Sequence, residues 1–397
     1  MLKFYSEFRS AEQNIVPKPL SQTARDIGNA ESKPRVLMVG MHLTKTRGGI
    51  STLIAEILKS PLKNEFELTY IESQAEDFGK FRKVFLALQA ISKFIFNCLL
   101  KNVDLVYVHL GSNASLYRES VFIILAKLLR KRVVAHFHAG DIDNYYPFQS
   151  KAGRKFISRA LNLSDSLLAV SQESARQLRE ITASPNISVI VNAIDTSVFG
   201  GDRRASNDDA VRLLFVGAVG KLKGERDLIK ALAILRDGKP NIKVSFLGYG
   251  AENLKDYCEE LKVGEFIEFA GAVSMSERIE FFQKADIFVL PTYAEALPMS
   301  VIEAMAAGLS VITTPVGGIP EIIEDGETGL LFPPGDANAL AEKITFLLNN
   351  KDARIEIGKK ARRKACAEMD FQVYVNKLRI HLDSFCAVKR RKEYDRH

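Results

Sequence analysis

The feature that most constrains the fold is an alternation of short apolar runs with longer segments of helical periodicity. The first run, Arg35–Gly40, ends in glycine and is followed by a polar loop and the helical pattern Ile50–Leu58. Such alternation predicts a parallel sheet covered by helices on both faces. It continues to about residue 195 and starts again after a polar break near 200–209. The sequence therefore predicts an α/β chain with two doubly wound, Rossmann-like domains.

These patterns divide the 397 residues into five expected segments. The segments are 1–33, a flexible N-terminal extension; 34–195, the first domain; 196–208, a linker; 209–370, the second domain; and 371–397, a C-terminal helix that packs back on the first domain and ends in a basic tail. In open α/β sheets, ligands bind beyond the carboxyl ends of the strands. We therefore expect the functional site in a cleft between the two domains.

Composition excludes several classes of protein. With 47% hydrophobic and 26% charged residues, the chain is neither disordered nor collagen-like. Its cysteines (Cys98, Cys258, Cys366 and Cys386) are far apart and form no C-x-x-C pair, which argues against a disulfide framework and favours a reducing compartment. No signal peptide and no apolar stretch of roughly 18 residues is visible, so we expect a cytoplasmic protein without a spanning helix.

The basic excess lies in the first half of the chain. Residues 1–200 hold 26 basic and 18 acidic side chains, against 29 and 30 in residues 201–397. Lys80–Lys101 contains five basic residues, no acidic ones and many apolar ones. We expect a helix here with most of its apolar residues in the core; the alternative is an interfacial helix on an anionic membrane surface. The segment is too apolar for nucleic-acid binding, so no nucleic-acid partner is predicted.

The strongest motif contains two glutamates around the start of a predicted helix. Pro298 fits the first turn of this helix and Gly308 its C-terminal stop. Glu303 then lies inside the helix, about 7 Å along its axis from Pro298, and Glu295 just before it. The two carboxylates could hold separate parts of one elongated ligand, with an anion bound between them by backbone N–H groups at 297–300. The alternative is that Glu295 interacts with the helix dipole and Glu303 is solvated.

The residues after these glutamates extend the pattern. Glu295-x7-Glu303 is followed by Ala304-Met305-Ala306-Ala307-Gly308 and by Thr314-Pro315-Val316-Gly317-Gly318-Ile319-Pro320-Glu321. The whole resembles the retaining nucleotide-sugar glycosyltransferases of family four, and the resemblance covers residues 35–385. It implies the GT-B fold, with two Rossmann-like domains facing a cleft. It also implies that Glu295 contacts the donor sugar, that Glu303 binds the ribose, and that backbone amides of Leu297, Met299 and Ser300 approach the sugar and diphosphate.

A glycine-rich loop forms the second motif. Residues 215–224 (FVGAVGKLKG) follow a predicted strand, and by themselves indicate a turn with two solvated lysines. In the resembled family, an Arg follows the first glycine, here Gly217, and a Lys precedes the last; both neutralise the diphosphate. Lys223 matches that Lys, but Ala218 stands where the Arg is usual. Lys221 is the candidate substitute, although a lysine lacks the planar fork of arginine.

The first domain contributes two further candidates. Gly48 and Gly49 precede a helix and form either a flexible turn or a close approach of the backbone to the donor phosphate or the acceptor across the cleft. The resemblance supports the second interpretation. His136 and His138 share one strand face, but no third metal ligand with suitable spacing is evident. The resemblance implies that His138 positions the donor sugar, and His109 is a weaker candidate on the acceptor side.

The resemblance implies a retaining, metal-independent glycosyltransferase with His138, Lys223 and Glu295 as catalytic residues. We expect a nucleoside diphosphate sugar, most commonly a UDP-sugar, as donor and no cofactor. The expected acceptor is a carbohydrate or lipid-linked sugar in cell-surface polysaccharide or glycolipid assembly, at the inner face of the plasma membrane. The one Asp-x-Asp sequence, Asp141–Asp143, lies in the wrong domain for a metal site.

Two functions are alternatives to a glycosyltransferase. Ala218 favours a non-catalytic nucleotide-sugar-binding subunit of a polysaccharide-assembly system. An NAD-dependent oxidoreductase is disfavoured, because no G-x-G-x-x-G follows the first strand.

Overall fold

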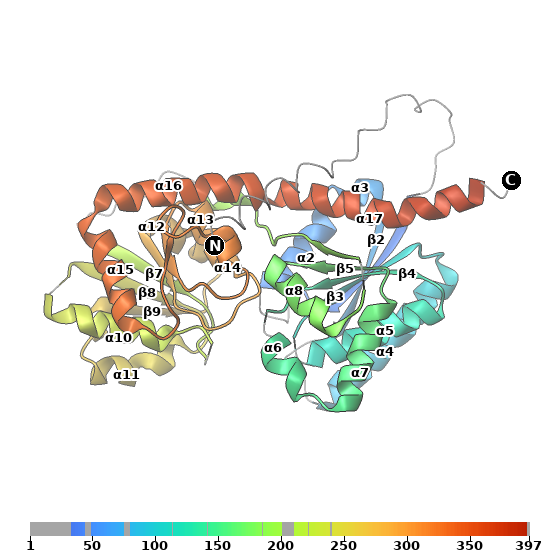
Figure 1. The fold of residues 1–397 in the computed structure, drawn as a ribbon, viewed down its shortest axis with the longest axis horizontal. Coiled ribbons are helices and arrows are strands. Elements are labelled where there is room, and N and C mark those ends of the chain that lie inside the picture. Colours follow the sequence, from blue (N-terminus) through green and yellow to red (C-terminus); the bar gives the residue numbers. More distant parts are fainter. Residues whose placement is uncertain are drawn as a thin grey trace, which may run out of the picture. The chain divides into compact units, whose positions relative to one another are not determined.

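The computed structural model describes residues 33–43, 49–74, 80–112, 114–140, 142–184, 186–200, 210–220, 222–238 and 240–394. The expected N-terminal extension up to residue 32, most of the expected linker, and the predicted site residues Gly48 and Lys221 lie outside these residues, as does Asp141. The described chain forms two lobes, each with a six-stranded parallel sheet between helices (Figure 1). This confirms the predicted fold class.

The first lobe holds a sheet with strand order β2-β1-β3-β4-β5-β6, and every described strand pair in it is parallel. Its strands are β1 (Arg35–Met41), β2 (Glu67–Gln74), β3 (Leu105–Leu110), β4 (Arg132–Phe137), β5 (Ser166–Ala169) and β6 (Ile187–Val189). Its helices are α2 (Gly49–Lys59), α3 (Leu62–Glu65), α4 (Lys80–Leu100), α5 (Ala114–Leu128), α6 (Ile142–Tyr145), α7 (Lys151–Leu163) and α8 (Gln172–Ile181). The short helix α9 (Thr196–Phe199) follows β6 and packs on the second lobe, where Phe199 is buried.

Alternate residues of the strands supply the two cores of this lobe. On β1, Val36 and Met38 pack with α2 and the C-terminal helix, whereas Leu37 and Val39 pack with α4, α5 and α7. Because successive strand side chains point to opposite faces, a strand that is apolar at every position must be covered on both sides. The continuous apolar runs of the sequence therefore require the two helical layers.

The second lobe has the strand order β12-β11-β10-β7-β8-β9, again parallel. Its strands are β7 (Val211–Val216), β8 (Ile242–Leu247), β9 (Ile267–Gly271), β10 (Ile287–Leu290), β11 (Ser310–Thr313) and β12 (Leu330–Leu331). Its helices are α10 (Glu225–Leu235), α11 (Lys255–Glu260), α12 (Met275–Lys284), α13 (Met299–Ala306), α14 (Ile319–Ile322), α15 (Ala337–Asn349) and α16 (Lys351–Glu368).

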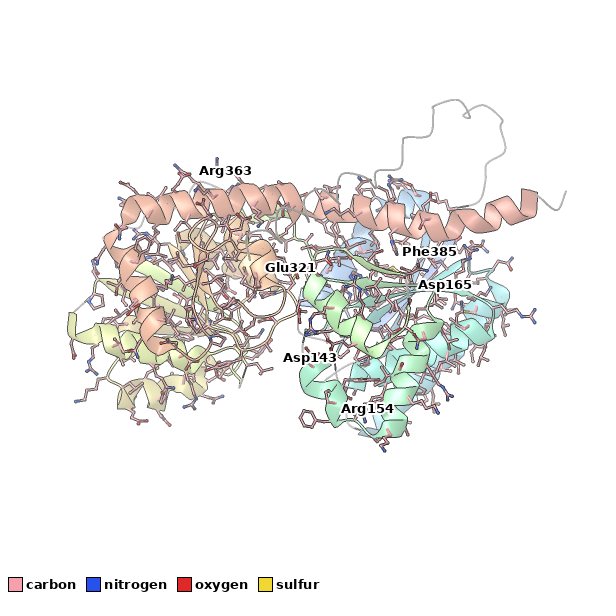
Figure 2. All side chains as sticks on the ribbon, in the orientation of Figure 1. Asp143, Arg154, Asp165, Glu321, Arg363 and Phe385 are labelled. Atoms are coloured by element: carbon pink, nitrogen blue, oxygen red, sulfur yellow. The ribbon has the colours of Figure 1, made fainter. Side chains whose placement is uncertain are left out.

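The chain then returns to the first lobe through α17 (Phe371–Tyr394). Tyr374, Leu378 and Leu382 of this helix are buried in the core that contains Val36, and Arg132 of β4 donates to the backbone carbonyl of Phe385 at 2.6 Å. Figure 2 labels Phe385 where α17 passes the first lobe.

The return passage lies directly beside the outgoing one. The backbone N–H of Ile194 donates to the carbonyl of Met369 at 3.1 Å, and that of Phe371 donates to the carbonyl of Ile194 at 2.8 Å. The Thr196 hydroxyl adds a 2.6 Å bond to the Asp370 carboxylate. Both passages between the lobes are therefore joined at one place.

Helix α4 differs from the expectation that most of its apolar residues lie in the core. Ala90, Phe94 and Cys98 are buried, and Ile91 and Ile95 are half-buried. The prediction is wrong for four residues that are exposed, namely Val84, Phe85, Leu88 and Leu99. The side chain of Phe81 lies outside the described ones. The physical reason is that α4 packs on β2 and α5 with one side only.

Candidate functional site

A cavity of about 580 Å³ is lined by residues from both lobes. It lies beyond the carboxyl ends of the strands, because its lining includes the segments that follow β3, β4, β7, β8 and β10. Of the predicted site residues, the lining includes Gly49, His138, Gly217, Lys223, Glu295, Leu297, Met299 and Ser300. The structure thus brings together, in one cavity, residues that are up to about 250 positions apart in the sequence.

Lys223 and Glu295 form an ion pair at the edge of this cavity. The Lys223 ammonium donates to Oε1 of Glu295. The Glu295 side chain is only 11% exposed and that of Lys223 is 32% exposed. The Leu222 carbonyl accepts bonds from the Thr292 hydroxyl and from the Tyr293 N–H, each at 2.8 Å, and so joins the two loops. Lys223 is therefore a cation held beside the cavity, and Ala218, which also lines it, adds no second charge.

Glycines allow the Glu295 loop to approach its neighbours closely. Gly317 has φ of +57°, and a Cβ there would lie 1.7 Å from the Glu295 carbonyl oxygen. The next N–H, of Gly318, donates to the Ala296 carbonyl at 2.9 Å. From the first lobe, a Cβ on Gly140 would lie 2.0 Å from the Ala296 nitrogen. The glycine pair at 317–318 therefore fixes the backbone that carries Glu295.

Helix α13 begins at the cavity wall. Pro298 is its N-cap, with φ of −74° and ψ of 119°, so it lies one residue before the helix rather than in its first turn. No side chain caps this end, and the first N–H groups of a helix have no intrahelical acceptor. Met299 and Ser300 carry such groups and line the cavity, which suits the end to an anion. Gly308, with φ of +73°, ends the helix as predicted.

Glu303 lies further along α13 and is buried against Arg278 of α12. The Arg278 Nε donates to Oε2 of Glu303 at 3.0 Å, and Nη2 donates to the same oxygen. Burial raises the pKa of Glu303, and the guanidinium partly opposes this rise. The alternative of a solvated Glu303 is therefore excluded. Glu303 lines a smaller neighbouring cavity of about 260 Å³, which shares Gly49, Arg278 and Met299 with the larger one.

Sequence reasoning missed Arg278. The capping box of Ser274 and Glu277 indicates where α12 begins and so places Arg278 in its first turns. Nothing local to that segment points to a partner 25 residues later, because the pairing depends on how two helices pack.

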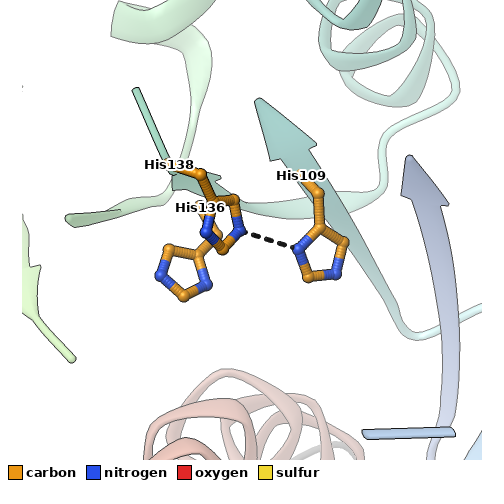
Figure 3. A group of neighbouring side chains, drawn as sticks. All are labelled: His109, His136 and His138. Carbon is orange, nitrogen blue, oxygen red and sulfur yellow. Dashed lines mark hydrogen bonds between the residues drawn. The ribbon is translucent and has the colours of Figure 1, made fainter. Parts of the chain in front are cut away.

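A buried group of three histidines, His109, His136 and His138, lies in the first lobe (Figure 3). His109 Nδ1 lies 3.1 Å from His138 Nε2, and the Tyr107 hydroxyl lies 2.6 Å from His136 Nδ1. Burial lowers the pKa of His138 to about 3, and holds the pKa values of His109 and His136 well below their usual range. The three rings are therefore neutral. Of the three, His138 lines the large cavity, together with Asn192.

One ring nitrogen from each of the three histidines lies within 4.8 Å of the others. The sequence spacing indicates no third ligand beside His136 and His138, but β3 places His109 there, in register with His136. His109, the weaker acceptor-side candidate, faces His138.

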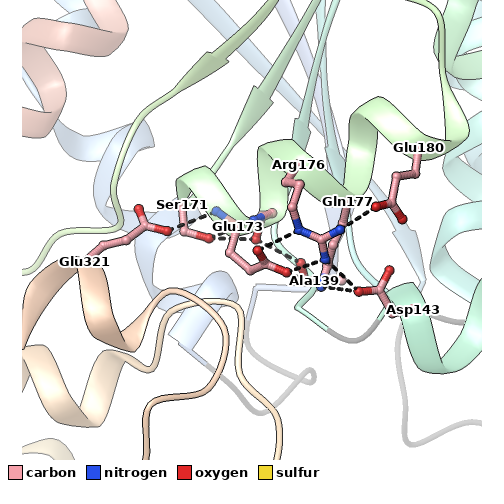
Figure 4. Close-up of polar contacts among 9 residues, drawn as sticks. Ala139, Asp143, Ser171, Glu173, Arg176, Gln177, Glu180 and Glu321 are labelled. Atoms are coloured by element: carbon pink, nitrogen blue, oxygen red, sulfur yellow. Dashed lines mark hydrogen bonds and ion pairs between the residues drawn. The ribbon is translucent and has the colours of Figure 1, made fainter. Parts of the chain in front are cut away.

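The lobes also meet at Glu321, which ends the second stretch of the sequence motif. Its carboxylate accepts backbone N–H bonds from Gln172 at 2.8 Å and Glu173 at 3.0 Å, at the start of α8 (Figures 2 and 4). A carboxylate at a helix N-terminus is stabilised by the helix dipole. Further along α8, Arg176 forms ion pairs with Asp143, Glu173 and Glu180.

Comparisons with known proteins agree with this architecture. Residues 47–198 match glycosyltransferase family 4, and residues 202–364 match the glycosyl transferases group 1. A sulfoquinovosyl transferase of Arabidopsis thaliana is 34% identical over 44% of this chain and 34% of that protein. The amylovoran biosynthesis glycosyltransferase AmsK of Erwinia amylovora is 26% identical over 69% of each chain. The chain spans between about a third and 62% of the length of the first curated relatives it matches.

Among solved structures, the Anabaena protein HepE in complex with UDP-glucose superposes with a TM-score of 0.72. The match covers 88% of this chain and 99% of that one at 18% identity, and shows a common fold. Three observations lead to one assignment. The two family matches together span both lobes, each lobe holds a parallel sheet, and the Glu295–Glu303 motif lies at the cavity. The chain belongs to glycosyltransferase family 4 and has the GT-B fold.

Proposed function

We propose that this protein transfers a glycosyl group from a nucleoside diphosphate sugar, with UDP as the nucleotide, to an acceptor hydroxyl. Transfer retains the configuration at the anomeric carbon and needs no metal ion. The observation that carries the proposal is the cavity that holds the Lys223 ammonium and the uncapped start of α13, with Glu295 on its wall and Glu303 behind it. HepE, solved with UDP and with UDP-glucose, supports the choice of nucleotide.

The diphosphate is the group that needs most stabilisation. In the proposed step, the bond from the anomeric carbon to the β-phosphate oxygen breaks and a bond to the acceptor oxygen forms on the same face. The acceptor proton passes to the departing phosphate oxygen. Lys223 and the N–H groups of Met299 and Ser300 stabilise the negative charge that grows there.

The sugar is oriented by two side chains on the cavity wall. Glu295, paired with Lys223, accepts hydrogen bonds from the sugar hydroxyls. His138 is neutral, so its ring offers one donor and one acceptor and adds no charge. Neither residue needs to act as a nucleophile in a same-face displacement.

The nucleoside end is assigned to Glu303. A carboxylate paired with Arg278 is a good acceptor for the two ribose hydroxyls. Arg278 lines both cavities, so it lies where the two parts of the ligand would join.

We place the reaction in the assembly of a cell-surface polysaccharide or glycolipid on the cytoplasmic side of the membrane. The relative AmsK, whose match covers 69% of each chain, is a glycosyltransferase of amylovoran biosynthesis. The acceptor is then a growing carbohydrate chain or a lipid-linked sugar.

The first test is a thermal-shift panel of UDP, GDP and ADP and their sugars. Ligands that bind the folded state raise Tm by mass action, and UDP compounds should give the largest rise. Glu303→Gln should abolish the rise, while Glu342→Gln, an exposed change on α15, should leave it intact. Equal shifts for Glu303→Gln and wild type would refute the ribose assignment.

The metal prediction has its own assay. Release of UDP from a UDP-sugar should continue in the presence of EDTA. Complete loss with EDTA, restored by magnesium, would refute metal independence.

Ala218 supports a second candidate function. Because this position adds no charge to the cavity, the protein could bind nucleotide sugars without turning them over, as a subunit of an assembly system. A Tm rise with UDP-sugars and no release of UDP, with any acceptor tried, would favour this alternative. Ala218→Arg should then raise the affinity for UDP, because it adds a guanidinium next to the diphosphate.

A further inference from the structure

One side of α4 is apolar and exposed. Six of its large apolar side chains are more than half exposed: Val84, Phe85, Leu88, Phe96, Leu99 and Leu100, at 54–67%. At 100° per residue these positions span an arc of about 160° on the helix. The opposite side, with Ala90, Phe94 and Cys98, is buried in the lobe. The exposed polar residues Gln89 and Ser92 lie within this arc, between an apolar cluster at 84–88 and one at 96–100. Clustered exposed apolar side chains of this kind mark an interaction surface.

The charges around this face are all of one sign along the helix. Residues 80–101 contain five basic residues and no acidic one. Lys93 and Lys101 are exposed. Helix α5 packs against α4 and ends at Leu128. That end carries Leu128, 72% exposed, and the exposed Arg130.

These observations distinguish a lipid surface from other occupants. Apolar side chains bordered by Lys93, Lys101 and Arg130, on a helix that carries no acidic residue itself, match the boundary between acyl chains and anionic headgroups. No helix among the described residues is long and apolar enough to cross a bilayer. The core side of α4 is fixed to the lobe, so the helix can only lie along a surface.

We propose that the exposed face of α4, which we define as Val84, Phe85, Leu88, Phe96, Leu99 and Leu100, docks on an anionic membrane surface. The proposal deepens the proposed function and rests on it in one respect: it makes the acceptor a molecule with a lipid anchor.

The position of α4 connects this face with the cavity of the transferase. A helix that follows a parallel strand begins at the carboxyl edge of the sheet, so Val84, Phe85 and Leu88 lie near the edge where the large cavity opens. A further cavity of about 250 Å³ lies between α4 and β2 at this edge, lined by Leu86, Lys93 and Glu72 among others. An acceptor held in the membrane under α4 would present its hydroxyl at the carboxyl edge of the first sheet.

Vesicle co-sedimentation of the full chain tests the docking. We expect binding to vesicles of phosphatidylcholine mixed with phosphatidylglycerol, and little binding to phosphatidylcholine alone. The double variant Phe85→Gln with Leu88→Gln should bind the mixed vesicles at least about tenfold more weakly, because two apolar side chains no longer enter the bilayer. Lys101→Gln with Arg130→Gln should weaken binding by about tenfold or more, and added salt should do the same.

The matched control is Phe346→Gln, an exposed apolar residue on α15 of the second lobe, which should bind like wild type. Unchanged vesicle binding in the Phe85/Leu88 variant would overturn the proposal. A second result would also overturn it: wild-type protein that binds no vesicles and is a dimer, with the Phe85/Leu88 variant a monomer. The face would then be covered by a second copy.

The Tm rise with UDP separates failure of this proposal from failure of the proposed function. The Phe85/Leu88 variant should keep the wild-type rise, because neither residue lines the donor cavity. Absence of any nucleotide effect in wild type would count against the transferase proposal and leave the vesicle result to be judged by itself.

Discussion

Arg278, whose side chain is half-buried, forms an ion pair with the buried Glu303, and the pair joins α12 to α13 where two cavities adjoin. Removing one partner leaves a buried charge uncompensated, which typically destabilises a protein more than removing both. Arg278→Met should therefore lower the free energy of unfolding by about 3 kcal/mol. The double variant with Glu303→Gln should recover most of that loss. Urea denaturation measures both, and equal losses in the single and double variants would contradict the pairing.

The loss should depend on pH in a defined direction. Burial raises the pKa of Glu303 above its unfolded value, so the folded state binds the proton more tightly and stability falls as pH rises. Without Arg278 the pKa rises further, and the fall extends to higher pH. Denaturation of Arg278→Met at about pH 5 and about pH 8 should show the larger deficit at the higher pH.

Lys223 should contribute to turnover through its charge. Lys223→Met should lower the rate of UDP release from a UDP-sugar by about 100-fold or more, the usual effect of losing one group that stabilises transition-state charge. Lys223→Arg keeps the charge and should restore part of the rate. A parallel Tm measurement detects any effect of leaving Glu295 without its partner. A Met variant with the wild-type rate would remove Lys223 from the mechanism.

The buried histidines predict acid sensitivity. Burial lowers the pKa values of His109, His136 and His138 in the folded protein, so below about pH 6.5 the unfolded chain binds more protons. Stability should therefore fall as pH decreases below that value, by roughly 1.4 kcal/mol per pH unit for each histidine. His136→Asn, which does not touch the large cavity, should make the dependence shallower by one proton. An identical slope in this variant would show that His136 is charged in the folded state.

Gly140 should tolerate no side chain. A Cβ there would lie 2.0 Å from the backbone nitrogen of Ala296, an atom that cannot move without shifting the Glu295 loop. Gly140→Ala should therefore reduce the Tm rise with UDP-sugars. Gly264→Ala is the matched control, because nothing lies within 4 Å of a Cβ at that position. Equal responses of the two variants would show that the approach of the lobes at Gly140 does not affect the site.

The sequence predicts those parts of this structure that depend on local periodicity or on a contiguous motif. The alternation of apolar runs and helices predicts both sheets, because burial on two faces requires it. Gly308 ends α13 because a positive φ favours glycine. The position of Glu295 before this helix follows from the same segment.

Contacts between separate elements could not be predicted in this way. The pairs Arg278–Glu303 and His109–His138 join residues 25 and 29 positions apart on different elements. Periodicity showed that α4 is a helix with many apolar residues, but not which of its sides the lobe leaves uncovered. That depends on how closely α5 and β2 approach it.

The two passages of the chain between the lobes are hydrogen-bonded to each other at Ile194 and Asp370. Any opening or closing of the large cavity is therefore expected to rotate the lobes about this point, since sliding one lobe along the other would break the hydrogen bonds of both passages at once. The same arrangement opposes domain swapping between two copies of the chain, because both connecting segments would have to separate from each other and move together. Truncation before α17 would thus remove one of the two hydrogen-bonded segments at this junction, and also the apolar residues that α17 contributes to the core of the first lobe.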